Sequence, residues 1–169
     1  MPKKKTKSKI KALKTKLNKL AKYLEKERVK FQLHTHKVVY TAYDTASTLK
    51  RKLDEIAKVV LVRTDKGLAL VVLPASRYVD MAAVKAALKV KKVAIATEKD
   101  ITKYLKTKVG LLHPFGNLYK IPTLIDRGFS KANKMIAAAG SYTESLEIAL
   151  KDFENLVKPI KGAFSKAKK

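Results

Sequence analysis

Apolar residues follow two different spacings along this chain, which predicts a mixture of strands and helices. A β-branched run at 58–63 and a second apolar run at 68–73 flank the turn sequence Thr-Asp-Lys-Gly, a pattern typical of a buried β-hairpin. An extended stretch is also predicted at 38–43. Further strands are expected at 31–33, 93–96, 118–125, 134–139 and 146–150.

Polar residues ahead of apolar positions predict where the helices begin. Asp44 or Thr45 is expected to cap a helix that runs to about residue 57. Asp80 is expected to cap a helix that ends near residue 88. Thr97 is expected to cap a short helix through Tyr104. Two further helices are expected, one ending near residue 28 and one over 151–157. Because strands and helices alternate, we predict an α+β fold with a mixed, largely antiparallel sheet flanked by helices.

The first 22 residues carry a lysine-rich pattern of their own, with no acidic residue. Their apolar residues, with Leu24, step by three and four and therefore share one helical face: Ile10, Leu13, Leu17, Leu20 and Leu24. We interpret this face as packing on the body, and a helix whose lysines lie along RNA phosphates is compatible with that packing. The expected organisation is a basic arm (1–22), a folded body (23–158) and a basic C-terminal tail (159–169).

Charge indicates the class of partner. The 169 residues include 39 Lys+Arg against 14 Asp+Glu, a net charge of +25, and 46% hydrophobic residues, enough for the core of one domain. Such an excess attracts a polyanion, so a nucleic acid is the expected partner. A membrane surface is disfavoured because the chain has no Trp anchor. Without an apolar run of about 20 residues or a signal-like segment, we expect a cytoplasmic protein.

Several kinds of chemistry lack their residues. There is no Cys, so thiolate metal sites and cysteine nucleophiles are excluded. His34 and His36 share one side of a strand, but two ligands without a third do not make a zinc site. The sequence also lacks the phosphate-binding GxxxxGK[ST] motif, the nucleotide-binding GxGxxG motif, the hydrolase GxSxG motif and the metal-binding HExxH motif. We therefore predict no metal and no small-molecule cofactor.

Two local features stand out from this background. Lys58 leads directly into the most apolar strand, although a lysine there can simply pack its stem and extend its ammonium into water. The loop at 108–116 contains Gly110 and Pro114, which permit close backbone approach and fix the exit of the loop. Each feature alone is a weak signal of function.

Together with other segments, these features resemble a known family over roughly residues 20–157. The segments occur in the family's order at 31–35, 56–62, 79–80, 90–96, 110–116, 121–126 and 146–148. The chain resembles the YbaK/prolyl-tRNA-synthetase-associated editing domain family, whose members hydrolyse mischarged aminoacyl-tRNA. Because no synthetase catalytic region is present, the resemblance implies a free-standing, trans-acting aminoacyl-tRNA deacylase.

The resemblance also implies residue roles. Lys58 matches the family's functional lysine, which would bind the aminoacyl ester end of the tRNA. The loop of Gly110, Leu111, Leu112, His113 and Pro114 matches the family's GxxxP loop, whose amides would position the ester and the terminal adenosine. His36, His113 and Glu147 are implied to line the pocket, and Asp126 to be structural. The basic arm is expected to bind tRNA through Lys3, Lys4, Lys5, Lys7, Lys9, Lys11, Lys14 and Lys16.

Three departures from the family pattern bear on specificity and turnover. Val59 stands where a threonine is usual, His113 where a serine is common, and Gly140 is one glycine where a pair is usual. In the implied mechanism water attacks the ester carbonyl, assisted by the free ribose hydroxyl, with no triad. Two alternatives stay open: a catalytically silent YbaK-like module that binds tRNA or RNA, and a structural basic protein of ribosome or chromatin type.

Overall fold

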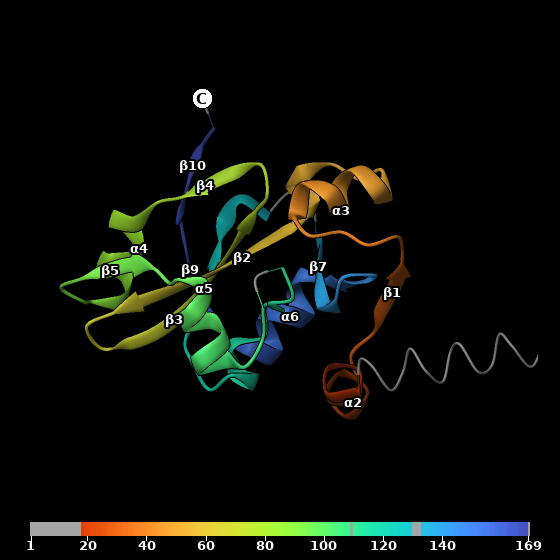
Figure 1. Cartoon of the computed structure of the whole chain (residues 1–169), viewed down its shortest axis with the longest axis horizontal. Helices are drawn as coiled ribbons and strands as arrows, with labels where there is room; N and C mark the ends of the chain where they lie inside the picture. Colours follow the sequence, from red (N-terminus) through yellow and green to blue (C-terminus); the bar gives the residue numbers. More distant parts are fainter. Residues whose placement is uncertain (1–17, 109, 130–132, 169) are drawn as a thin grey trace, which may run out of the picture.

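The computed structural model describes residues 18–108, 110–129 and 133–168 (Figure 1). The helices are α2 (Asn18–Lys26), α3 (Ala42–Leu49), α4 (Met81–Leu88), α5 (Glu98–Asp100, continued by a π-helical turn over Ile101–Leu105) and α6 (Leu150–Val157). The strands are β1 (Phe31–Thr35), β2 (Ala57–Thr64), β3 (Gly67–Pro74), β4 (Arg77–Val79), β5 (Val93–Ile95), β6 (Thr123–Asp126), β7 (Lys134–Ser141), β8 (Glu144–Ala149), β9 (Ile160–Gly162) and β10 (Ser165–Ala167).

The strands form two sheets and a separate pair. The larger sheet has the order β5-β2-β3-β6-β9, with parallel pairing of β3 with β6 and of β6 with β9 and antiparallel pairing elsewhere. The smaller sheet, β1-β8-β7, is antiparallel, as is the pair of β4 with β10. This topology confirms the predicted α+β class and its mixed, largely antiparallel pairing.

The predicted hairpin is present as β2 and β3. Its register pairs Thr64 with Gly67 at the turn and Lys58 with Leu73 near the other end. Gly67 has φ +124°, a conformation open to glycine and strained for other residues. Most of the apolar side chains of β3 are fully buried, so the hairpin forms the centre of the larger sheet.

A junction between the two sheets sets the place of the site. A parallel bridge pairs Ile56, just before β2, with Ile136 of β7. Both side chains are buried together with Ala46 of α3 and Ala75 after β3. The junction therefore brings α3 and the start of β2 against the smaller sheet.

The largest core cluster lies against the other face of the smaller sheet and includes aromatic residues from three segments. Phe115 packs edge to face on Phe153 of α6, with ring centroids 5.4 Å apart. Leu20 and Leu24 of α2 are buried in the same cluster, which confirms packing for this part of the predicted apolar face. Ile10, Leu13 and Leu17 lie outside the described residues.

The beginning and end of α3 differ from the prediction. Thr41, not Asp44 or Thr45, is the N-cap: its hydroxyl accepts from the Asp44 amide, while the Asp44 carboxylate accepts from the Thr41 amide. Asp44 is therefore the third helical residue. The extended stretch expected at 38–43 is too long: Thr41 has an extended backbone, but residues 42 and 43 are helical. The helix ends at Leu49 because Lys50 adopts a left-handed conformation.

The strand predicted over 118–125 is also too long. A 3₁₀ turn occupies Gly116–Leu118, and β6 begins only at Thr123. Pro122 has no amide proton, so the residue before Thr123 cannot donate a ladder hydrogen bond.

The C-terminal segment differs from the solvated tail that we expected at 159–169. Residues 160–162 pair with β6 and residues 165–167 pair with β4. The segment after α6 therefore adds two strands to the fold. Phe164 between them is buried, and its amide donates to Asp126 Oδ1 at 2.7 Å. Asp126 Oδ2 accepts from the Ser165 hydroxyl and the Gly128 amide, each at 2.8 Å. This confirms a structural role for Asp126.

Candidate active site

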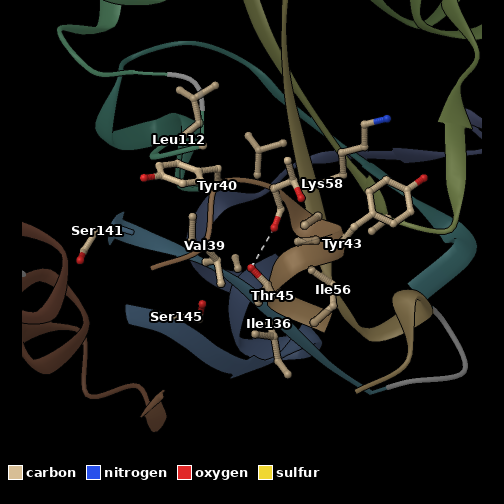
Figure 2. Close-up of a pocket in the computed structure, with 18 residues that line it drawn as sticks. Val39, Tyr40, Tyr43, Thr45, Ile56, Lys58, Leu112, Ile136, Ser141 and Ser145 are labelled. Atoms are coloured by element: carbon tan, nitrogen blue, oxygen red, sulfur yellow. Dashed lines mark hydrogen bonds between the residues drawn. The ribbon is translucent and has the colours of Figure 1, made fainter. Parts of the chain in front are cut away.

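A pocket of about 320 Å³ lies at the junction of the two sheets (Figure 2). Its walls come from the segment before α3, the start of β2, the loop after Gly110 and the strands β7 and β8. Val39, Ile56 and Ile136 make much of the wall apolar, and in Figure 2 Lys58 and Ser145 lie on opposite sides of the pocket. The arrangement suits a small apolar group carried on a larger ligand.

Lys58 is the one charged residue among the described residues that line the pocket. Its half-buried side chain extends to the rim, where Nζ lies 5.7 Å from the ring centroid of Tyr78. No carboxylate of the described part of the chain lies within 4 Å of this ammonium. The positive charge is therefore available to a ligand.

The loop that contains Gly110 forms the wall facing Lys58 and β2. Gly110 has φ +87°, and a Cβ at this position would lie 2.7 Å from the carbonyl oxygen of Tyr40. Glycine is thus required both for the conformation and for the approach of the loop to the segment before α3. Gly110 and Leu112 line the pocket, whereas Leu111 and the buried Pro114 do not.

The amides of this loop differ in their availability. Leu111 N donates to Lys108 O, and His113 N donates to the Tyr119 hydroxyl. Within the described residues the Leu112 amide has no acceptor, and Leu112 lines the pocket. It is therefore a candidate donor for a ligand oxygen.

His36, expected to line the pocket, lies outside the lining and contacts it only through Ser145 of β8. Nδ1 of His36 lies 2.8 Å from the carbonyl oxygen of Lys37, and Nε2 lies 2.8 Å from Ser145 Oγ. Because a carbonyl only accepts, Nδ1 of the neutral ring carries the proton and Nε2 accepts from the serine hydroxyl. Ser145 lines the pocket, so its oxygen can still accept from a bound ligand.

Glu147 lies two residues further along β8 and outside the pocket lining. Its Oε1 lies 2.7 Å from His34 Nε2 and 3.2 Å from Arg51 Nη2. Burial raises the pKa of Glu147, but the hydrogen bond from His34 and the charge of Arg51 outweigh burial and hold the pKa below its usual value. Glu147 therefore ties the segment after α3 to the smaller sheet, on the face of β8 that also carries Ser145.

His113 also lies outside the pocket lining. Its ring stacks on Tyr119 with centroids 4.4 Å apart, and its Nδ1 accepts from the Phe115 amide at 3.2 Å. Burial lowers the pKa of His113 from 6.5 to about 4 and raises the pKa of Tyr119 to about 12. His113 is therefore a neutral residue that shapes the loop from behind.

We expect His113 to make the fold sensitive to acid. Its pKa is lower in the folded chain than in the unfolded one, so the unfolded chain binds more protons between about pH 6.5 and pH 4. The contribution of His113 to the free energy of unfolding is complete above pH 6.5, and roughly 3 kcal/mol of it is lost as the pH falls to 4. His113→Asn, whose amide oxygen can accept from Phe115, should lack this part of the pH dependence. Urea unfolding of both proteins at pH 7, 5.5 and 4 measures the difference, and equal pH slopes would contradict the assignment.

Sequence reasoning missed Ser145, Thr45 and Val39 among the residues that line the pocket. Ser145 was detectable in principle, because it has the same strand parity as Glu147, and His36 has the parity of His34 on β1. The lysines predicted to bind tRNA, Lys3 to Lys16, lie outside the described residues.

The described part of the chain has neither a cluster of metal ligands nor a membrane-spanning helix. No group of three or more His, Asp or Glu side chains is placed to hold a metal ion. No helix is long and apolar enough to cross a membrane.

The fold is α+β, and the pocket between its two sheets has mostly apolar walls and one lysine among its described lining residues. A family model, the aminoacyl-tRNA editing domain, matches residues 36–156. The chain therefore belongs to the aminoacyl-tRNA editing domain family, which confirms the resemblance drawn from the sequence and implies aminoacyl-tRNA as the ligand.

Solved structures share the fold. The hypothetical protein APE2540 superposes with a TM-score of 0.81 at 18% identity, covering 87% of this chain and 99% of that one. A proposed trans-editing enzyme for prolyl-tRNA synthetase superposes with a TM-score of 0.77 at 15% identity, covering 90% and 98%. At such identities the likeness establishes the fold.

Proposed function

We propose that this protein is a free-standing editing hydrolase that deacylates mischarged tRNA. The observation that carries the proposal is that Lys58 and the Gly110 loop, far apart in sequence, line one apolar pocket. Membership of the editing domain family supports aminoacyl-tRNA as the substrate class.

The pocket walls suit the amino-acid part of such a substrate. Apolar side chains enclose about 320 Å³, and the ammonium of Lys58 lies at the rim. The side chain of the amino acid would enter the pocket, with the ester and the ribose at the rim. Apolar walls of this kind discriminate by about 10- to 200-fold per methylene, so size would be the main basis of selection.

Hydrolysis in this site would rely on stabilising charge and not on a triad. Water attacks the ester carbonyl, and the free hydroxyl of the terminal ribose assists it. Negative charge then develops on the carbonyl oxygen, where the Lys58 ammonium and the Leu112 amide would stabilise it. The ribose oxygen leaves with a proton, releasing the amino acid and intact tRNA.

The test is deacylation of a panel of tRNAs, each carrying a non-cognate amino acid, by the full chain. We expect faster release than in buffer for at least one mischarged tRNA, while correctly charged tRNA is preserved. If no ester is hydrolysed but tRNA still binds, the protein is the catalytically silent binding module. If removal of residues 1–17 abolishes all association and no hydrolysis occurs, it is a structural basic protein.

A further inference from the structure

The C-terminal strand brings a second lysine to the rim of the pocket. Lys168 follows β10, and its Nζ donates to the carbonyl oxygen of Ala75 at 2.8 Å. The same ammonium lies 4.1 Å from the ring centroid of Tyr43 and 5.1 Å from that of Tyr78. Because Ala75 and Tyr43 line the pocket, Lys168 lies at its edge.

Backbone pairing holds this lysine in place. β10 pairs with β4 through Ser165 opposite Val79 and Ala167 opposite Arg77. Arg77 Nε also donates to Ser165 Oγ at 2.6 Å, and Asp126 accepts from the same hydroxyl. The position of Lys168 is therefore set by the strand that precedes it, and little further ordering is needed when a ligand binds.

Lys58 and Lys168 form a pair of cations at the rim. Both ammonium groups lie against the ring of Tyr78, Lys58 at 5.7 Å and Lys168 at 5.1 Å. Within the described chain no carboxylate lies within 4 Å of either ammonium. Two positive charges at one rim without a counter-charge attract a polyanion, which can present separate groups to each of them.

We propose that Lys168 is a positioning residue that binds the phosphodiester next to the terminal nucleoside of the aminoacyl-tRNA. This inference rests on the proposed function and adds a second contact to it: Lys58 acts at the ester, and Lys168 fixes the strand that carries the ester. The family model matches residues 36–156. Lys168 lies outside that range, so the family match does not assign this phosphodiester contact.

Tyr43 and Tyr78 favour a nucleic acid over a free anion as the occupant. Their side chains are 49% and 53% exposed, so their rings have free surface beside the two ammonium groups. A flexible single strand binds well where cations follow its backbone and aromatic rings stack with its bases. The 3′ end of a tRNA is such a strand.

The test compares Lys168→Met with Lys166→Met. Lys166 lies two residues before Lys168, within β10, but its Nζ lies 4.0 Å from Asp80 Oδ1. The two variants therefore remove the same charge from one segment. We expect Lys168→Met to raise KM for a mischarged tRNA by roughly tenfold with kcat within twofold, and Lys166→Met to change neither. Lys168→Arg should restore most of the affinity.

Salt dependence separates a phosphate contact from a structural one. For an RNA oligonucleotide ending in CCA-3′, the slope of log Kd against log salt should fall by about 0.7 in Lys168→Met. Loss of thermal stability with an unchanged slope and KM would show that Lys168 only holds the C-terminal strand in place. Equal behaviour of the Lys168 and Lys166 variants would also overturn the inference.

These outcomes are distinct from failure of the proposed function. If the wild-type protein hydrolyses no aminoacyl ester, the deacylase proposal fails, and the oligonucleotide slope still decides whether Lys168 contacts phosphate. If hydrolysis proceeds and Lys168→Met has the wild-type KM and slope, only the Lys168 inference fails.

Discussion

Replacing Lys58 by Met is expected to lower kcat/KM for deacylation of mischarged tRNA by at least about 100-fold. Lys58 is the only charge among the described residues that line the pocket, and in Figure 2 its ammonium points outward from the lining, to the side on which a bound tRNA would lie. Methionine keeps a stem of similar length, so packing beside Tyr78 changes little. The melting temperature should therefore stay close to that of the wild type.

Lys85→Met is the matched control for the Lys58 variant. Lys85 is exposed on α4 and does not line the pocket, so its variant changes net charge by the same amount. Rates should be measured for both variants at several salt concentrations. A Lys58 variant with the wild-type rate would remove this residue from the mechanism, and equal losses in both variants would indicate an effect of net charge alone.

Gly110→Ala is expected to lower activity by about 10- to 100-fold and to destabilise the fold by about 1–3 kcal/mol. Alanine at φ +87° is strained, and its Cβ would lie 2.7 Å from the carbonyl oxygen of Tyr40. Relief of that clash must move the loop or the segment before α3, and both are walls of the pocket. Steady-state kinetics and urea unfolding measure the two effects.

Gly140→Ala separates backbone strain from the clash. Gly140 has φ +81°, and a Cβ at this position meets nothing within 4 Å. Its alanine variant should show a similar loss of stability with a much smaller loss of activity. If the two variants lose activity equally, close approach at Gly110 is not what shapes the pocket.

The sequence predicted elements correctly where local residue chemistry alone determines the structure, as at a helix cap or a hairpin turn. Asp80 was expected to cap a helix and does so, accepting from the Ala83 amide. The hairpin turn and the strand after Lys58 were likewise predicted from local chemistry. Thr41 and Asp44 show the limit: both are good capping residues, and only the reciprocal pair of hydrogen bonds fixes which one is the cap.

The site was less predictable because tertiary contacts decide it. His36 and His113 are equivalent candidates by residue type, yet one bonds to Ser145 in the pocket lining and the other stacks on Tyr119 behind the loop. The C-terminal segment was expected in solvent because its many lysines outweigh its one aromatic residue, Phe164, in any estimate from composition. Phe164 is buried and brings β9 and β10 onto the fold.

The hydrogen bonds that Asp126 accepts from Phe164 and Ser165 have a practical consequence for fusion proteins. They hold the segment that leads to Lys168 beside Tyr43 and Tyr78. An affinity tag or fluorescent reporter joined directly after Lys168 would begin beside the pocket rim and obstruct access of a macromolecular ligand. Immobilisation for binding measurements is better achieved through another part of the surface, such as the exposed side of α4.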